Sequence, residues 1–153
     1  MSNDAEELYR MQLAPEMMSF LGGEPPSLDE IRESIERNSV RVRETGLGIC
    51  AAVLKASGQI VGRCGLFYSD IEGKQAVELA YLIDREYWGK GLATEASAAL
   101  IDDGLKSVEE IIAVISPQNI ASIRVAEKLG FQYGRRLSSH KDFGVVDIYS
   151  ISR

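Results

Sequence analysis

A glycine-rich turn between a predicted strand and a predicted helix constrains this chain more than any other segment. Gly89 and Gly91 lie in EYWGKGLATEA (86–96), after an apolar run at 77–83 and before small residues at helical spacing. The first N–H groups of a helix are unpaired, and the helix dipole adds partial positive charge there. Glycine has no Cβ to keep a phosphate away from the backbone. The segment therefore predicts a site for a cofactor that carries a pyrophosphate.

Length and charge narrow the class of protein. The 153 residues predict one domain, 1–153. The net charge of −6 argues against a nucleic-acid partner and is compatible with cationic substrates such as amines. No run of 18 apolar residues appears, so we expect no membrane span and a cytoplasmic location.

Cysteine and histidine usage argues against a metal site. Cys50 and Cys64 both lie in apolar, strand-like runs, which is typical of buried, reduced thiols. His140 is the only histidine, which excludes a site built from several histidines. We predict no metal, and we place His140 on the surface, in a polar loop at 138–142.

Hydrophobic periodicity predicts a mixed order of helices and strands. A helix at 5–21 is followed by a second helix that begins at Ser27 with the S-x-x-E capping box. A polar, turn-like stretch is expected at 69–75, and Gly130 is expected to end the last helix. Strands are expected at 48–55, 60–68, 76–83, 110–115, 131–137 and 145–150, with further helices at 93–106 and 121–129.

A second motif, at 119–131, makes the glycine-rich turn more specific. NIASIRVAEKLGF (119–131) is by itself also typical of an ordinary helix start, with Asn119 and Ser122 as its polar residues. Together with YWGKGLATEA (87–96), and with the strand segments IVGRCGL (60–66) and VELAYLID (77–84), it resembles the GNAT superfamily of acyl-CoA N-acyltransferases. The resemblance covers residues 27–152 and is strongest to the branch of the ribosomal-protein N-terminal acetyltransferases.

The resemblance implies a fold of the α+β class. The GNAT fold has a mixed, mostly antiparallel sheet whose central strands splay apart, with helices on both faces. The branch usually opens with a strand of the type ERLxLRPL, and this order begins with a helix instead. Either the sheet has lost this edge strand, or the gene starts upstream. A missing edge strand would leave unpaired backbone groups, which a homodimer could cover.

The resemblance also implies acetyl-CoA as cofactor. The strand at 81–83 would bond the pantetheine amides, and the strand at 111–115 would splay away. The backbone amides from Trp88 to Ala93 would hold the pyrophosphate. Lys90 and Lys128 are potential phosphate partners, although both are equally well read as solvated lysines. The implied cofactor-binding residues are Tyr81, Leu82, Ile83, Trp88, Gly89, Lys90, Gly91, Leu92, Ala93, Thr94, Asn119, Ser122 and Lys128.

The implied reaction is direct attack of a primary amine on the acetyl thioester. The acceptor would be a protein N-terminus or a small-molecule amine. Glu78 is the candidate general base and would act through a water molecule. The alternative is that Glu78 is only a charged residue on the face of a strand or a salt-bridge partner. Many members of the superfamily carry a tyrosine acid where this chain has Ala126. We read Tyr81, Tyr133 and Tyr149 as structural.

Two other functions remain open at the level of the sequence. The first is a non-catalytic module of the same fold that binds acyl-CoA or serves in an assembly. The second is a nucleotide-binding regulator whose glycine loop takes ATP. Glu86, with Arg85 beside it, replaces the Gln or Arg that often begins the family's glycine motif.

Overall fold

The computed structural model describes residues 2–19, 23–141 and 143–153. Its centre is a six-stranded sheet with the strand order β1-β2-β3-β4-β6-β5. None of the helices in these described ranges is both long and apolar enough to cross a bilayer. The elements are α1 (Ser2–Gln12), α2 (Pro15–Met18), α3 (Leu28–Thr45), β1 (Gly48–Val53), β2 (Ile60–Ile71), β3 (Lys74–Ile83), η1 (Arg85–Tyr87), α4 (Leu92–Gly104), β4 (Glu110–Ile115), α5 (Ile120–Lys128), β5 (Gln132–His140) and β6 (Gly144–Ser152).

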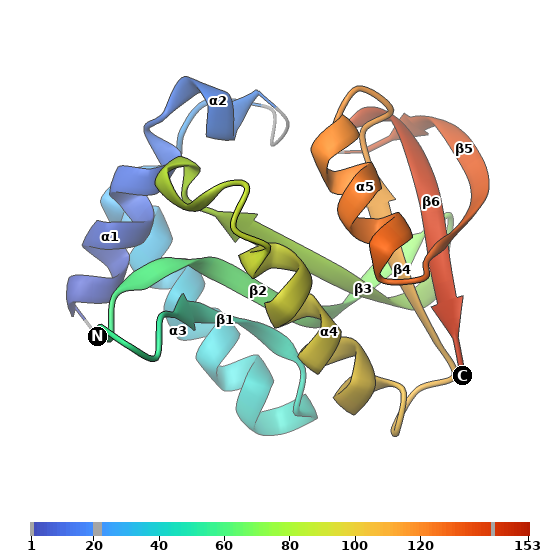
Figure 1. Cartoon of the computed structure of the whole chain (residues 1–153), viewed down its shortest axis with the longest axis horizontal. Coiled ribbons are helices and arrows are strands. Elements are labelled where there is room, and N and C mark those ends of the chain that lie inside the picture. Colours follow the sequence, from blue (N-terminus) through green and yellow to red (C-terminus); the bar gives the residue numbers. More distant parts are fainter. Residues whose placement is uncertain (1, 20–22, 142) are drawn as a thin grey trace.

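The sheet confirms the predicted fold class. Its strands pair antiparallel, except that β3 and β4 are parallel and share a single register pair, Glu78 with Ile112. Beyond this point β3 continues along β2, while β4 continues along β6. The two central strands therefore diverge, as Figure 1 shows between η1 and α5.

Helices cover both faces of the sheet. In Figure 1, α4 and α5 lie in front of the sheet and α3 lies behind it. The main core forms where α4 and α5 meet the sheet, around Leu66, Ile101, Ile111 and Phe131. Gly104 of α4 faces the Leu66 and Ile111 side chains so closely that a Cβ would clash with Leu66, which seats the helix on the strands.

Of the helices predicted near the N-terminus, the second starts as expected, whereas the first is divided into two. The predicted helix at 5–21 is wrong as a single element, because α1 ends at Gln12 and α2 begins with Pro15. Proline lacks an N–H and so begins a helix readily but does not continue one. The capping box of α3 is confirmed, since Glu30 N donates to Ser27 Oγ (3.3 Å) and Ser27 N donates to the Glu30 carboxylate (2.6 Å).

α3 covers part of the open edge of the sheet. No strand precedes β1 in the described residues, so β1 is an edge strand. The Asn38 side chain accepts a hydrogen bond from Ile49 N (2.8 Å) and donates one to Ile49 O. This side chain satisfies the two backbone groups of Ile49, and α3 packs so closely that a Cβ on Gly48 would clash. The exposed edge is thus shorter than the sequence suggests.

Three local predictions are corrected by the structure. The polar stretch at 69–75 is mostly strand, since β2 and β3 extend to a two-residue turn at Glu72 and Gly73, both with positive φ. His140 ends β5 instead of lying in a loop, and its ring stacks on Phe143 at 5.3 Å. Cys50 is exposed because it lies on the edge strand, whereas Cys64 on β2 is buried as expected.

Candidate active site

The opening between β3 and β4 organises the candidate site. Because the strands part after Glu78, residues 79–83 hydrogen-bond to β2 on one side but have no register partner on β4. Backbone N–H and C=O groups that face such an opening need partners from elsewhere. This segment contains the predicted pantetheine residues Tyr81, Leu82 and Ile83.

The glycine loop presents a row of unpaired amides next to the opening. No residue in the described chain accepts a hydrogen bond from the backbone N–H groups of residues 89–94, and Glu95 N is the first to bond within α4. Gly89 and Gly91 both have φ near +75°, a conformation that L side chains rarely adopt. Gly91 is the N-cap of α4 and offers no side chain to the helix start. The arrangement suits an anion.

The side chains at the start of this loop are engaged with the protein. The Trp88 amide donates to Arg85 O (3.1 Å), and its indole Nε1 donates to Ile83 O (2.7 Å). Lys90 lies over the Tyr87 ring, with Nζ 4.7 Å from the centroid. The set of available amides therefore begins at Gly89, one residue later than the predicted cradle.

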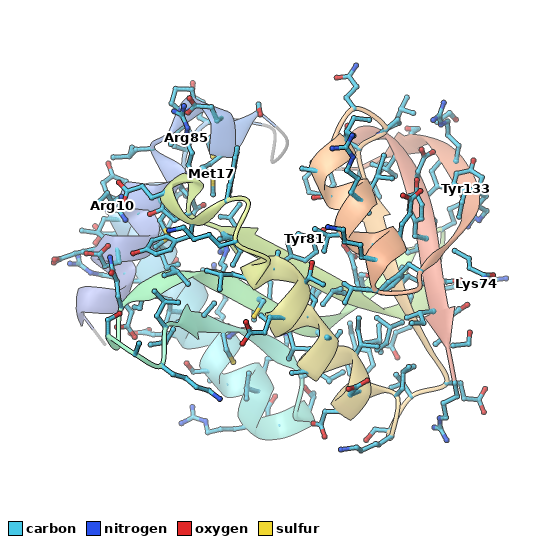
Figure 2. The ribbon with its side chains drawn as sticks, viewed as in Figure 1. Arg10, Met17, Lys74, Tyr81, Arg85 and Tyr133 are labelled. Atoms are coloured by element: carbon cyan, nitrogen blue, oxygen red, sulfur yellow. The ribbon has the colours of Figure 1, made fainter. Side chains whose placement is uncertain are left out.

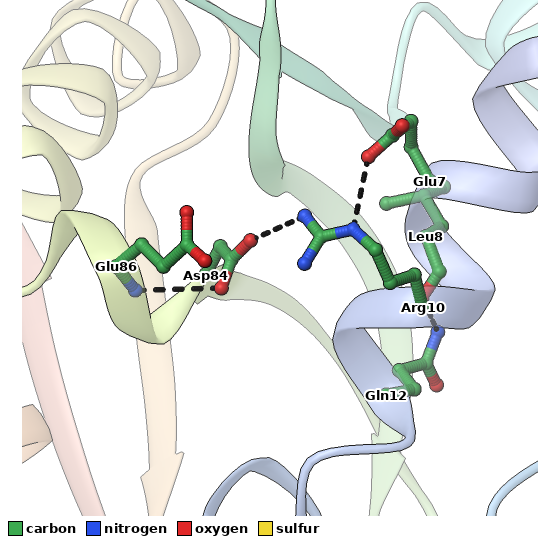
Figure 3. Close-up of polar contacts among 6 residues, drawn as sticks. All are labelled: Glu7, Leu8, Arg10, Gln12, Asp84 and Glu86. Atoms are coloured by element: carbon green, nitrogen blue, oxygen red, sulfur yellow. Dashed lines mark hydrogen bonds and ion pairs between the residues drawn. The ribbon is translucent and has the colours of Figure 1, made fainter.

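A buried carboxylate anchors the loop to the N-terminal helices. Asp84, 5% exposed, accepts hydrogen bonds from Arg10 Nη2 (2.6 Å) and from the Glu86 amide (3.4 Å). Arg10 also contacts Glu7 at 3.2 Å, as Figure 3 shows. The Asp84 carboxylate raises the pKa of the Arg10 guanidinium, so Arg10 is positively charged at neutral pH. α1 thus fixes the position at which β3 passes into the loop.

A second ion pair reinforces this anchor. Arg85 Nη1 lies 2.5 Å from Glu16 of α2, and both side chains are largely exposed. Figure 2 shows Arg10 and Arg85 on the side of the molecule where α1 and α2 meet the loop. Arg85 is therefore committed to a carboxylate on the protein and is not an unpaired positive charge beside the glycines.

Tyr81 links the two sides of the opening. Its hydroxyl donates to Ser122 O of α5 at 3.2 Å, and Figure 2 shows the ring directed from β3 toward that helix. Burial raises the pKa of Tyr81, so the phenol is neutral at physiological pH. The Asn119 side chain accepts a hydrogen bond from Ser122 N (3.1 Å) and caps α5. Three predicted cofactor residues therefore meet here, one from β3 and two from the start of α5.

The remaining predicted residues fall in different places. Glu78 is half-buried at the point where β3 and β4 part. Lys128 is exposed at the last residue of α5, roughly 13.5 Å along the helix from Asn119. Ala126 is buried in the core at 2% exposure, so its position supplies no acid. Tyr133 and Tyr149 pack edge to face at 5.7 Å on β5 and β6.

Sequence reasoning did not find Arg10 and Asp84. They are 74 positions apart, and although Asp84 ends the segment VELAYLID (77–84), no sequence pattern connects it with Arg10. The one local signal was Asp84 itself, an acidic residue at the end of an apolar strand and before a turn, which is a frequent capping position.

Comparisons with known proteins show the family to which the chain belongs. A family model described as "Acetyltransferase (GNAT) domain" matches residues 1–132. The chain is 33% identical over 125 residues to the uncharacterized protein YkkB of Bacillus subtilis, covering 80% of this chain and 72% of that protein. It is 29% identical over 154 residues to the uncharacterized N-acetyltransferase p20 of Bacillus licheniformis, covering 97% and 86%.

A solved structure shows the same fold. RimL, a ribosomal L7/L12 alpha-N-protein acetyltransferase in complex with coenzyme A, superposes with a TM-score of 0.81 at 15% identity, covering 99% of this chain and 90% of that one. The chain therefore belongs to the GNAT acetyltransferase family. By class it is an acetyltransferase that takes its acetyl group from acetyl-CoA.

Proposed function

We propose that this protein transfers the acetyl group of acetyl-CoA directly to a primary amine, with residues 1–153 acting as one domain. The observation that carries the proposal is the row of unpaired amides at 89–94, beside the opening between β3 and β4. A diphosphate bound there would place the pantetheine arm along residues 81–83. The thioester would then lie near Glu78, where the strands part.

Groups beside the opening can remove the proton of the amine and stabilise the oxyanion. An amine must lose a proton before it attacks, and Glu78 can take that proton through a water. A backbone N–H beside the opening can stabilise the tetrahedral oxyanion, a contribution typically of about 3–4 kcal/mol. The leaving thiolate needs little help, because a free thiol has a pKa of about 8.5.

The acceptor is proposed from the branch that the chain resembles. RimL acts on a protein N-terminus, and another neighbour of the same fold is named as an aminoglycoside acetyltransferase. A protein N-terminus is therefore our first candidate acceptor and a small-molecule amine is the second. A non-catalytic acyl-CoA-binding module is the alternative if no amine is acetylated.

Cofactor binding is tested with a matched pair of glycine variants. Gly91→Val and Gly58→Val both force a β-branched residue into a positive φ, near +75° and +71°, where a Cβ meets open space. We expect acetyl-CoA to raise the melting temperature of the wild type and of Gly58→Val, but not that of Gly91→Val. Equal stabilisation of both variants by acetyl-CoA, or stabilisation of the wild type by ATP alone, would contradict the proposal.

The role of Glu78 is tested by turnover. Release of free CoA is measured over a panel of peptides and small amines for the wild type, Glu78→Gln and Glu110→Gln, the last being an exposed glutamate on β4. We expect Glu78→Gln to lower kcat about 100-fold and to remove the acidic limb of the pH profile. An unchanged profile would eliminate Glu78 as the base.

A further inference from the structure

A second concave site lies on the opposite side of the sheet from α4. It is a pocket of about 160 Å³ between α1, α3 and the first two strands. Arg37 and Arg41 of α3 and Arg63 of β2 line it, beside apolar Leu8 and Ile35. In a chain with a net charge of −6, this grouping of guanidinium groups is unexpected.

Arg63 is the central residue of this arginine pocket. It is half-buried, and burial lowers the pKa of its guanidinium. Arginine nevertheless stays charged in proteins. Among the described residues no carboxylate or other acceptor pairs with it, whereas Arg37 contacts the exposed Glu33 at 3.3 Å. A partly buried charge without a partner is unfavourable, so the site calls for an anion from outside the chain.

The sheet register places this pocket on the same face as the candidate base. Arg63 is opposite Leu82, and Phe67 is opposite Glu78. Side chains at alternate positions of a strand share a face, as do directly opposed residues on neighbouring strands. Arg63 and Glu78 therefore lie on one face, separated by roughly 13 Å along the strands.

The residues between these two side chains on this face of the sheet are small. The one pair of residues between them on this face is Gly65 and Ala80, which are opposite each other. The β1 backbone at 48–49 fills the space above Gly65 so closely that a Cβ there would clash. Ala80 carries only a methyl group, so an extended segment that runs from Glu78 toward Arg63 would pass over β3. An acceptor could thus contact both ends at once.

We propose that the arginine pocket binds acidic side chains of a peptide acceptor whose N-terminal amine is acetylated near Glu78. This inference rests on the proposed function. An extended peptide advances about 3.4 Å per residue, and the arginine side chains span part of the 13 Å, so the acidic residues would fall at roughly positions 2 to 4 of the acceptor. Arginine pairs with carboxylates in two parallel hydrogen bonds, which gives the pocket selectivity for acidic over neutral side chains.

Binding can be measured without turnover. Fluorescence anisotropy compares two C-terminally labelled peptides that begin with acetyl-Ser-Glu-Glu-Glu and acetyl-Ser-Gln-Gln-Gln. We expect the wild type to bind the Glu peptide about tenfold more tightly, and added salt to weaken this preference. Arg63→Met should abolish it, whereas Arg43→Met, which removes an exposed arginine of α3 that does not line the pocket, should retain it. Arg41→Met is the second pocket variant if Arg63→Met does not fold.

Acetylation kinetics distinguish a failure of the arginine pocket from a failure of the proposed function, on which this inference rests. With unblocked Ser-Glu-Glu-Glu and Ser-Gln-Gln-Gln peptides, Arg63→Met should raise KM for the Glu peptide while leaving kcat and the acetyl-CoA affinity unchanged. Equal binding of the two blocked peptides to the wild type would overturn the pocket assignment whether or not acetyl transfer occurs. Preferential acetylation of phosphoethanolamine would overturn the choice of a peptide. Failure to acetylate any amine, with the acidic preference in binding intact, would reject the proposed function alone.

Discussion

At the scale of single residues, the Asp84 side chain connects three elements of the fold. Its two carboxylate oxygens accept from Arg10 and from the Glu86 amide, so it joins α1, the end of β3 and η1. Asp84 itself lies five residues before Gly89 and outside EYWGKGLATEA (86–96). The loop's position therefore depends on a residue outside its own motif.

Replacing Asp84 should weaken both stability and cofactor binding. Asp84→Asn leaves Arg10 without its buried partner, and because Arg10 is itself half exposed we expect a loss of about 1–2 kcal/mol in unfolding free energy. The matched control is Asp103→Asn, which removes an exposed pair with Lys106 and should cost almost nothing. Urea unfolding and an acetyl-CoA titration measure the two effects. Equal losses in both variants would contradict the anchoring role.

The two thiols should react at very different rates. Cys50 is exposed, whereas burial raises the pKa of the Cys64 thiol and so lowers its thiolate fraction. We expect a thiol reagent such as DTNB to label one equivalent rapidly in the native protein and the second only on unfolding. Rapid labelling of both in native buffer would show that β2 is more open than described.

At the scale of elements, the β5–β6 hairpin depends on an ion pair sensitive to pH. Arg136 contacts both oxygens of Asp147 at 2.8 and 3.0 Å, and these hydrogen bonds lower the pKa of Asp147. A lowered carboxylate pKa stabilises the fold above the unfolded value of about 3.9, and this contribution is lost as the pH falls through the lower, folded pKa.

Stability measured against pH tests the pair. Urea unfolding between pH 7 and pH 3 should show the wild type losing more unfolding free energy than Asp147→Asn, so that the two proteins converge in acid. Parallel curves across the whole range would show that the pair does not contribute. The control Arg135→Gln removes a neighbouring exposed pair with Glu72 and should keep the wild-type pH dependence.

Elements with local signals could be predicted, and those set by distant contacts could not. The capping box placed α3 and the glycine loop placed the start of α4, because both depend on residues within a few positions. The turn predicted at 69–75 was too long, because the polar residues on either side of Glu72 and Gly73 lie on solvated strand ends. The candidate site divides in the same way. Its motif residues were found, but the Arg10–Asp84 pair and the arginine pocket require the folded sheet.

At the scale of the whole molecule, the sheet consists of two parts joined at one register pair. β1–β3 form one part and β4–β6 the other, and Tyr81 adds a hydrogen bond from the first part to α5. Coenzyme A bound between them should protect amides at 79–83 and 89–94 from hydrogen exchange and leave the β1–β2 hairpin unchanged. Comparison of exchange with and without coenzyme A measures this. Protection confined to the β1–β2 hairpin would place the ligand elsewhere.

The divergence of β3 from β4 also bears on how long the protein survives in a cell. Beyond Glu78 and Ile112 these two strands of the six-stranded sheet do not pair with each other. A small molecule that hydrogen-bonds to both would fill the opening between them and stabilise the folded chain. Ligand occupancy then sets the fraction of open chains that proteases can cut. We expect the abundance of this enzyme to rise and fall with the acetyl-CoA supply of its host, with no change in its synthesis.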